Sequence, residues 1–215
     1  MDIIAFDCDI HRYGAPWTGL EPLTKPSRPT RDPLGKVWDV SCWVNGGDVY
    51  EINNCLKKNL SKALVEKQKY MDMVDVNVPG NHDLDKFEAI RQIKKIQDLS
   101  VAFEHGHMGS LWPYEKGYEY VHKNKPGCGY FKYAFCKALN WGRGVHDYKL
   151  KPDVLSRIQS TIKNEDVLIL GHSHPKELID EMVYVNGRFV RIFICPQGRN
   201  YFKVFKDDIE YMGKE

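Results

Sequence analysis

Residues 73–83 read MVDVNVPGNHD, an apolar run that ends in a polar loop containing glycine. Short apolar runs that end in turn residues are typical of buried strands. The same pattern recurs along the chain, and each copy ends in a loop that carries histidine or aspartate. The other copies are IIAF before DCDIH (3–11), VWDVSCWV before NGGD (37–48), SVAFE before HGH (100–107) and VLIL before GHSH (167–174). The sequence therefore predicts five strands, each followed by a polar loop.

Two helical stretches are predicted between these strands. Residues from about 50 to 70 place Leu56, Leu60, Ala63 and Leu64 on one face, and residues from about 86 to 98 place Phe87, Ile90, Ile93 and Ile96 on one face. Strands that alternate with helices indicate βαβ units, so we expect an α/β fold with largely parallel core sheets. Ligands of such sheets bind beyond the carboxyl ends of the strands. The polar loops are therefore expected to share one rim.

Composition favours a single globular domain over residues 1–215. Hydrophobic residues make up 42% of the chain and charged residues 28%, and the net charge is +2. This near-neutral balance gives no reason to expect nucleic acid as a partner. The chain carries no signal-peptide pattern and no membrane segment, and its six cysteines include no CxxC pair, so we expect reduced thiols and a cytoplasmic location.

The polar loops carry a set of potential metal ligands. Asp9 and His11 lie two residues apart, as do His172 and His174, and the period of a strand turns both members of such a pair to one side. Together with Asp48, Asn81 and His105, they supply imidazole and oxygen but no thiolate, which suits Mn, Fe, Zn, Ni or Co. Seven ligands exceed the needs of one ion. Two ions about 3.5–4 Å apart that share a carboxylate would use them, and such a pair promotes displacement at phosphorus.

The order of these loops resembles the calcineurin-like metallophosphoesterase superfamily. The matching motifs are Asp9-Ile10-His11, Gly47-Asp48, Gly80-Asn81-His82-Asp83, His105-Gly106-His107 and Gly171-His172-Ser173-His174. The resemblance covers residues 1 to about 107 and 165 to about 205. It implies a four-layer αββα sandwich of two mixed sheets. In motif style the chain looks most like the small bacterial phosphodiesterases and, more loosely, the UDP-2,3-diacylglucosamine diphosphatases.

The resemblance also implies a role for each motif residue. Asp9, His11 and His174 would hold one metal, Asn81, His105 and His172 would hold the second, and Asp48 would bridge them. A hydroxide between the ions is the implied nucleophile. His82 is implied to face the substrate and Asp83 to orient its imidazole. We place His107 near substrate, with a capped loop histidine as the alternative, and Arg199 as a substrate contact, with a surface arginine as the alternative.

Three features depart from the family pattern. Asp7 stands where relatives often carry an apolar residue; we favour a salt-bridged framework acid over a residue that supports the ligands. The stretch 12–40 contains five prolines, which disfavour a helix, and is expected to be either a lid or a surface wrapping. The stretch 108–164 is rich in aromatic residues, and Lys and Arg outnumber Asp and Glu between 115 and 151. It is expected to be a cap over the site or a small subdomain with its own core.

The tail after GHSH predicts a hairpin, because ELIDEMVYV and RFVRIFIC flank Asn186-Gly187, a pair that favours a type I′ turn. CPQGRNYFKVF predicts a further strand. Together these observations predict a dinuclear metal-dependent hydrolase of a small phosphodiester or phosphomonoester substrate. The alternatives are hydrolysis of the pyrophosphate bond in a nucleoside-diphosphate conjugate and a non-catalytic scaffold. Scaffold members of the superfamily have lost ligands, whereas all seven are present in this chain.

Overall fold

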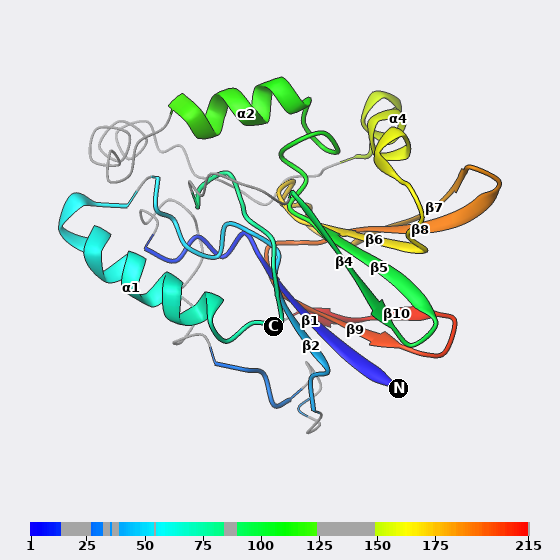
Figure 1. Cartoon of the computed structure of the whole chain (residues 1–215), viewed down its shortest axis with the longest axis horizontal. Coiled ribbons are helices and arrows are strands. Elements are labelled where there is room, and N and C mark those ends of the chain that lie inside the picture. Colours follow the sequence, from blue (N-terminus) through cyan, green and yellow to red (C-terminus); the bar gives the residue numbers. More distant parts are fainter. Residues whose placement is uncertain are drawn as a thin grey trace.

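Two five-stranded mixed sheets pack face to face in the computed structural model (Figure 1). The structure describes residues 1–13, 27–31, 35, 39–53, 55–83, 90–123 and 149–214. The first sheet has the order β10-β9-β1-β2-β3, and the second has the order β4-β5-β6-β8-β7. The strands are β1 (Asp2–Cys8), β2 (Cys42–Asn45), β3 (Val76–Asn77), β4 (Arg91–Ile96), β5 (Leu99–Glu104), β6 (Val167–Leu170), β7 (Ile179–Val185), β8 (Arg188–Ile194), β9 (Gly198–Val204) and β10 (Ile209–Lys214).

Each sheet combines three parallel strands with two strands that pair antiparallel. β1, β2 and β3 run parallel in the first sheet, as do β5, β6 and β8 in the second. The pairs β9–β10, β4–β5 and β7–β8 are antiparallel, and β9 also pairs antiparallel with β1. The prediction of two mixed sheets is therefore confirmed, whereas the expectation of largely parallel sheets holds only for three strands of each sheet.

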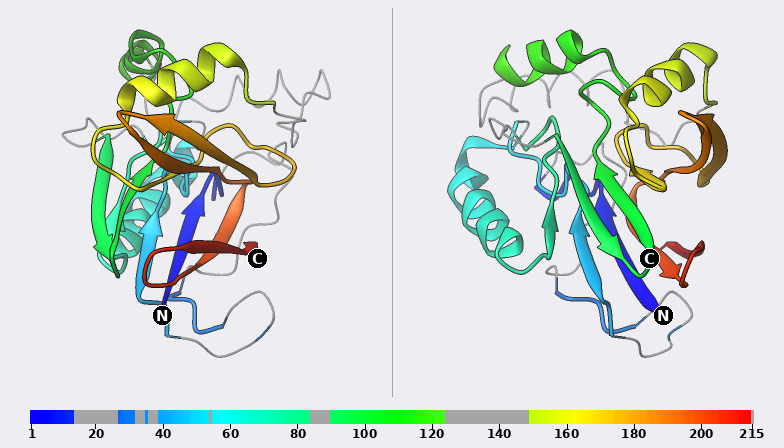
Figure 2. Two further views of the ribbon diagram at one scale, coloured as in Figure 1. Left: turned by 90° about the vertical axis from the view of Figure 1, so that its right-hand side faces the viewer. Right: turned by 45° about the vertical axis from the view of Figure 1, so that its right-hand side comes forward.

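Helices cover the outer faces, which gives four layers (Figure 2). The core between the sheets includes Phe6 of β1 and Phe103 of β5, whose rings stack with centroids 6.2 Å apart. α1 (Leu60–Met71) follows a 3-10 turn (Lys57–Asn59) and packs Ala63 and Tyr70 on the outer face of the first sheet. α4 (Pro152–Thr161) packs Val154 and Ile158 on the outer face of the second sheet. The predicted αββα sandwich is thus confirmed.

The helix predicted from about 50 to 70 forms only in its second half. It begins at Leu60, directly after the 3-10 turn, and Leu64, predicted on its buried face, is 45% exposed. Lys67 takes a buried position instead, because its ammonium donates to the carbonyl of Asp83 at 3.1 Å.

The helix predicted from about 86 to 98 does not form over residues 90–98, and residues 84–89, which include Phe87, lie outside the described residues. Residues 91–96 form the edge strand β4, which turns at Gln97 and pairs with β5. Ile93, predicted on a buried helical face, is 54% exposed. Burial alternates along β4, so Ile93 lies on its exposed face and Ile96 on its buried face. Their spacing of three residues therefore does not mark one face of a helix.

The hairpin predicted around Asn186-Gly187 is confirmed as β7 and β8. Both turn residues have positive φ, 52° and 84°, as a type I′ turn requires. The further strand predicted after it is β9, which lies in the first sheet rather than beside the hairpin.

The stretch 108–164 contributes to two parts of the molecule. α4 belongs to the outer layer of the sandwich, whereas α2 (Tyr114–Lys123) lies at the end toward which β1 and β2 point (Figure 2). Residues 124–148 lie outside the described residues, as do 14–26, 32–34 and 36–38 of the expected lid. Within the described ranges, no helix is both long and apolar enough to cross a membrane.

Candidate metal centre

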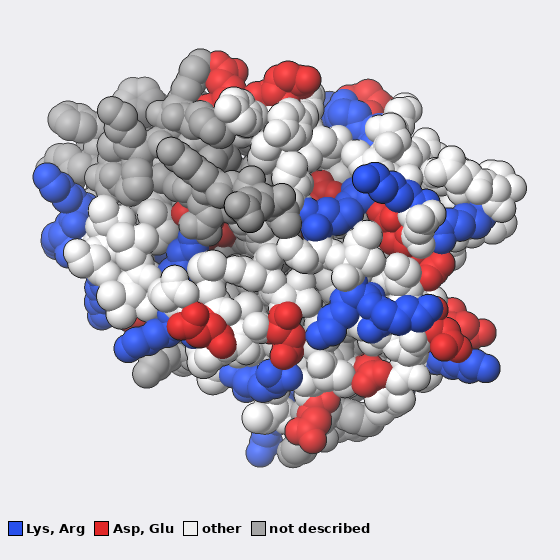
Figure 3. Space-filling model, in the orientation of Figure 1, with Lys and Arg blue, Asp and Glu red and all other residues white. Residues whose placement is uncertain are grey.

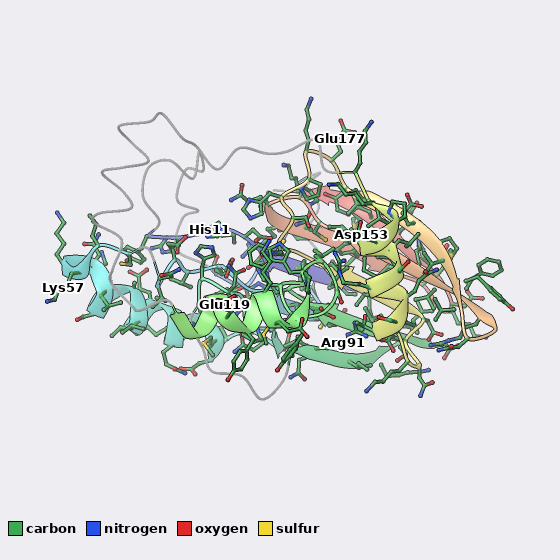
Figure 4. The ribbon with its side chains drawn as sticks, turned by 90° about the horizontal axis from the view of Figure 1, so that it is seen from above. His11, Lys57, Arg91, Glu119, Asp153 and Glu177 are labelled. Atoms are coloured by element: carbon green, nitrogen blue, oxygen red, sulfur yellow. The ribbon has the colours of Figure 1, made fainter. Side chains whose placement is uncertain are left out.

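The polar loops meet at one rim, as the sequence predicts. Asp9 follows β1, Asp48 follows β2 and Asn81 follows β3, while His105 and His172 follow β5 and β6 of the other sheet. Parallel strands bring their carboxyl ends to the same edge, so two sheets that pack face to face bring both sets of loops together. Figure 4 looks down on this rim, with His11 labelled. All seven predicted ligands lie there.

Five of the seven expected ligands have a left-handed backbone. Positive φ is uncommon for residues other than glycine, and it concentrates where surrounding structure enforces a functional geometry. The five are Asp9 (56°), His11 (52°), Asp48 (55°), His172 (68°) and His174 (47°). Each of the loops after β1, β2 and β6 thus turns sharply at its ligands, which directs them away from the course of the strand.

Asp9, His11 and His174 form the first ligand group. Nε2 of His174 lies 3.0 Å from Oδ1 of Asp9 and 3.5 Å from Nε2 of His11. Asp9 and His11 are almost fully buried, with exposures of 0% and 2%. One ligand atom from each residue lies within 4.8 Å of the others, which is a spacing that one ion could bridge.

Asp48, His105 and His172 form the second group. Nε2 of His105 lies 3.3 Å from Oδ2 of Asp48 and 3.2 Å from Nδ1 of His172, and Oδ1 of Asn81 is 3.1 Å from the same nitrogen. The other ring nitrogen of His105 is 2.9 Å from the carbonyl oxygen of Gly46, which fixes the ring.

The two groups are adjacent. Oδ1 of Asp9 in the first group lies 3.9 Å from Nε2 of His105 in the second, and Oδ2 of Asp9 accepts a hydrogen bond from the backbone amide of His172 at 2.7 Å. Asp9 therefore connects the groups in this structure. Oδ1 of Asp48 accepts a hydrogen bond from the backbone amide of His82 at 2.6 Å, and its Oδ2 faces His105. The bridging role assigned to Asp48 stays a prediction.

A close approach of glycine shapes the second group. A Cβ on Gly80 would lie 2.1 Å from Oδ1 of Asp48 and 2.3 Å from its backbone nitrogen. The loops after β2 and β3 can therefore approach this closely only because position 80 carries no side chain.

Electrostatics keep the carboxylates ionised. Burial by itself would raise the pKa of Asp9, but His174 and His105 outweigh it and hold the pKa below its usual range. The pKa of Asp48 is likewise lowered against its burial, chiefly by His105 and His82. Burial would lower the pKa of His105, but Asp48 and Asp9 raise it to about 9.

Burial favours the neutral form of two other imidazoles, those of His172 and His11. Burial, followed by the neighbouring His105, lowers the pKa of His172 well below its usual value. Burial also lowers the pKa of His11, against the opposing effect of Glu51. Neutral imidazoles and ionised carboxylates are the forms that bind metal, and this donor set suits first-row divalent ions. The residues present therefore fit two such ions.

Glu51 is the site residue that the sequence reasoning missed. Its Oε1 lies 2.6 Å from Nδ1 of His82, and its Oε2 lies 3.0 Å from Nδ1 of His11. Burial would raise the pKa of Glu51, but the two histidines lower it below its usual range. The signal that the sequence offered was the position of Glu51, three residues after Asp48 in the same loop. That position alone does not distinguish a buried acid that contacts the site from an acid exposed to solvent.

Asp83 contacts the backbone of two ligand loops. Its Oδ2 accepts hydrogen bonds from the backbone amides of Asp48 and Gly80 at 3.0 and 2.9 Å. Asp83 thus ties together the loops that carry Asp48 and Asn81, while Glu51 contacts the ring of His82. Catalytic roles for His82 and Asp83 stay predictions.

His107 lies at the second ligand group rather than on an exposed loop. It is 1% exposed, and its ring centroid is 5.2 Å from that of His105 and 6.2 Å from that of His172. Burial, with a smaller effect of His105, lowers the pKa of His107 to about 3, so it is neutral. Its contact with substrate stays a prediction.

Arg199 lies in a strand and is buried, so it is not the surface arginine of the alternative interpretation. It lies in β9, is 7% exposed, and its Nε donates to Oδ1 of Asp7 at 2.7 Å. Asp7 also accepts from Nε1 of Trp43 at 2.8 Å and from the hydroxyl of Tyr70 at 2.9 Å. The favoured interpretation of Asp7 as a salt-bridged framework acid is confirmed. A contact of Arg199 with substrate stays a prediction.

The described parts of the two unassigned stretches differ in their relation to the site. Within the stretch 12–40, Arg28 pairs with Asp75 at 3.0 Å, and the carbonyl of Ser27 accepts a hydrogen bond from Arg199 at 3.3 Å. This part therefore lies along the first sheet. In the stretch 108–164, the ring centroid of Trp112 lies 4.2 Å from that of His172. The second stretch therefore reaches an expected metal ligand.

Comparisons with known proteins give structural likenesses without sequence relatives. No family model matches the chain, and no curated protein matches it. A dimetal phosphatase from Danio rerio is 11% identical over 99% of this chain and 95% of its own, with a TM-score of 0.48. A predicted phosphoesterase from Streptococcus pneumoniae TIGR4 is 10% identical over 98% and 88%, with a TM-score of 0.38. Vacuolar Protein Sorting 29 from Cryptosporidium parvum is 12% identical over 98% and 95%, with a TM-score of 0.37.

At these identities and TM-scores, nothing about activity follows from the likenesses. The chain's own architecture is more informative: two mixed sheets lie between outer helices, and five ligand-bearing loops meet at one rim. This is the arrangement that the motif order predicts. The resemblance to the calcineurin-like metallophosphoesterases is therefore confirmed at the level of the fold.

Proposed function

We propose that the protein hydrolyses phosphomonoesters or phosphodiesters with the help of two divalent metal ions. One observation carries the proposal: two buried ligand groups, Asp9–His11–His174 and Asp48–His105–His172, lie side by side. They approach to 3.9 Å between Asp9 and His105. Two adjacent groups of this composition suit a pair of ions that binds one phosphate.

The metals would contribute charge and a nucleophile. When bound, two divalent ions would neutralise phosphate oxygens and lower the pKa of water so that hydroxide forms near neutral pH. We propose Mn as the resident metal, with Fe, Ni, Co and Zn as the alternatives that reconstitution would distinguish. Asp48 is proposed as the ligand shared by both ions.

His82 is proposed as the group that acts on the leaving oxygen. Its Nδ1 is engaged by Glu51, so we assign the exchange of a proton with substrate to Nε2. Its backbone amide meanwhile contacts Asp48, which fixes the distance between His82 and the ligand groups.

A small substrate is proposed in preference to nucleic acid. On the face shown in Figure 3, lysine and arginine side chains are interspersed with aspartate and glutamate rather than gathered into a continuous basic surface. The formal net charge of +2 agrees with this choice.

The test is metal reconstitution followed by turnover. The protein is freed of metal, loaded separately with Mn, Ni, Co, Zn or Mg, and assayed with 4-nitrophenyl phosphate and bis(4-nitrophenyl) phosphate. We expect about two ions per chain and hydrolysis of at least one ester. Trace metal after reconstitution together with no turnover would reject the proposal in favour of a non-catalytic scaffold. Lys69→Ala, an exposed change on α1, serves as the control for handling.

A further inference from the structure

α2 is fixed against one of the ligand loops. It lies at the end of the molecule where the ligand loops meet, and Figure 4 looks down on it with Glu119 labelled. A Cβ on Gly117 would lie 2.1 Å from the carbonyl oxygen of His107. The helix can therefore pack directly on the HGH loop only because position 117 is glycine.

Trp112 precedes α2 and is held by the same loop. Its backbone amide donates to the carbonyl of Gly106 at 3.2 Å, and its carbonyl accepts from Gly109 at 2.9 Å. Its ring meets that of His172 edge to face, with centroids 4.2 Å apart and an angle of 86°. Backbone and ring contacts thus place the indole beside an expected metal ligand.

Lys116 brings a positive charge to this place. Its ammonium lies 4.4 Å from the centroid of the Trp112 ring. Trp112 lies two residues before α2 and Lys116 lies in its first turn, so the start of the helix carries the ammonium back over the indole. A cation over an indole is stabilised by about 0.5–1 kcal/mol at an exposed site, which positions the ammonium without neutralising its charge.

Lys116 has two acidic neighbours along α2. Glu115 and Glu119 are also on α2, but among the described residues neither forms an ion pair with Lys116 within 4.0 Å. Lys116 is exposed, so an anion can reach it from solvent. Lys116 belongs to neither ligand group, so its positive charge is additional to the metal centre.

We propose that Trp112 and Lys116 form a subsite for a second anionic group of the substrate, beside the phosphate that is hydrolysed. This inference rests on the proposed function and narrows its substrate to phosphoesters that carry a further phosphate or carboxylate. An ammonium is a compact point charge that binds phosphate oxygens, and the indole restricts where that charge lies. A substrate with one phosphate and no second anion gains nothing from the subsite.

The test compares two nucleotides that differ by one phosphate. Adenosine 3′,5′-bisphosphate and adenosine 5′-monophosphate are measured as inhibitors of 4-nitrophenyl phosphate hydrolysis by the metal-loaded protein. We expect wild type to bind the bisphosphate more tightly. Lys116→Ala should weaken the bisphosphate about five- to tenfold and change the monophosphate less than about twofold. Lys116→Arg should retain most of the preference, and Lys69→Ala all of it.

Three outcomes would overturn the subsite: no preference in wild type, equal weakening of both nucleotides by Lys116→Ala, or no effect of Lys116→Glu on the bisphosphate. If wild type hydrolyses no ester, the proposed function fails by itself. The same nucleotide comparison by titration calorimetry on the metal-loaded protein then decides the subsite without catalysis.

Trp112 is tested by two variants, because its ring also touches His172. Trp112→Phe keeps an aromatic face and should keep most of the bisphosphate preference, whereas Trp112→Leu should lose it. Thermal melting and metal content accompany both. Loss of the preference in a folded, metal-loaded Trp112→Leu supports the subsite, and retention of the preference in that variant overturns the part assigned to the indole.

Discussion

Oε1 of Glu51 lies 2.6 Å from Nδ1 of His82, and both side chains are buried. The other oxygen of the same carboxylate lies 3.0 Å from Nδ1 of His11. One carboxylate therefore links the proposed acid to an expected metal ligand. Such a link fixes both rings and ties the position of the acid to that of the metal.

Glu51→Gln should lower kcat about 10- to 100-fold, the usual effect of removing a partner that orients a ligand or a catalytic imidazole. The amide keeps the size of the side chain but removes the charge that faces the rings of His82 and His11. The measurement is steady-state kinetics with metal analysis on the same samples. Glu66→Gln is the matched control, since Glu66 pairs with Arg12 in a partly exposed position. A kcat within twofold of wild type would show that Glu51 does not position His82.

Asp48→Asn and His82→Ala should separate metal binding from chemistry. Asp48→Asn removes a charged ligand, so metal occupancy and activity should fall together. His82→Ala should keep its metal and lose about 10² to 10⁴ in rate, the range for a general acid or an electrostatic contact. Metal analysis and turnover are compared for both variants. Residual activity of His82→Ala within tenfold of wild type would reject His82 as a catalytic group.

The sequence predicts the ligand loops well because each follows a short apolar strand. In β6, for example, all four residues of VLIL are buried, and the histidines come directly after them. A continuous apolar run indicates a strand that is buried on both faces, and the polar residues that follow it indicate a loop. Both signals can be recognised from a short stretch of sequence. The prediction fails at β4, where two isoleucines of an edge strand stand at a helical spacing.

The partners of the site residues could not be predicted in the same way. Glu51 and His82 are 31 residues apart, and Trp112 and His172 meet across two different loops. Nothing in the local pattern around Glu51 or Trp112 specifies these contacts, since they depend on how the loops cross after the sheets have packed. Asp7 illustrates the opposite case, because an acid inside an apolar strand must find a charged partner.

Arg199→Leu should destabilise the fold. The change leaves the Asp7 carboxylate, which is 0% exposed, without its cationic partner in β9. Removing one member of a buried ion pair costs about 3–5 kcal/mol in the free energy of unfolding. Denaturant unfolding measures this cost. An unchanged free energy of unfolding with a raised KM would instead assign Arg199 to substrate.

Asp7→Asn tests the same pair from its other side. The amide keeps a hydrogen-bond acceptor for Trp43 and Tyr70 but loses the charge that balances Arg199. We expect a smaller loss of stability than in Arg199→Leu, with activity of the folded fraction unchanged. Activity lost without any loss of stability would place Asp7 in the metal centre rather than in the framework.

Gly80→Ala should empty part of the metal centre. The added Cβ would lie 2.1 Å from Oδ1 of Asp48, closer than any real contact, so the loop after β2 or β3 must shift. That shift moves Asp48 away from His105, whose Nε2 is now 3.3 Å from it, and separates the two amides that Asp83 binds. We expect metal content to fall by about one ion per chain, with turnover falling in parallel.

Gly187→Ala is the control, because its φ is also positive but nothing lies within 4 Å of the added atom. It should cost about 1 kcal/mol of stability and no metal. Full metal content in Gly80→Ala would show that Asp48 is not a ligand at the position proposed, whatever the effect on rate.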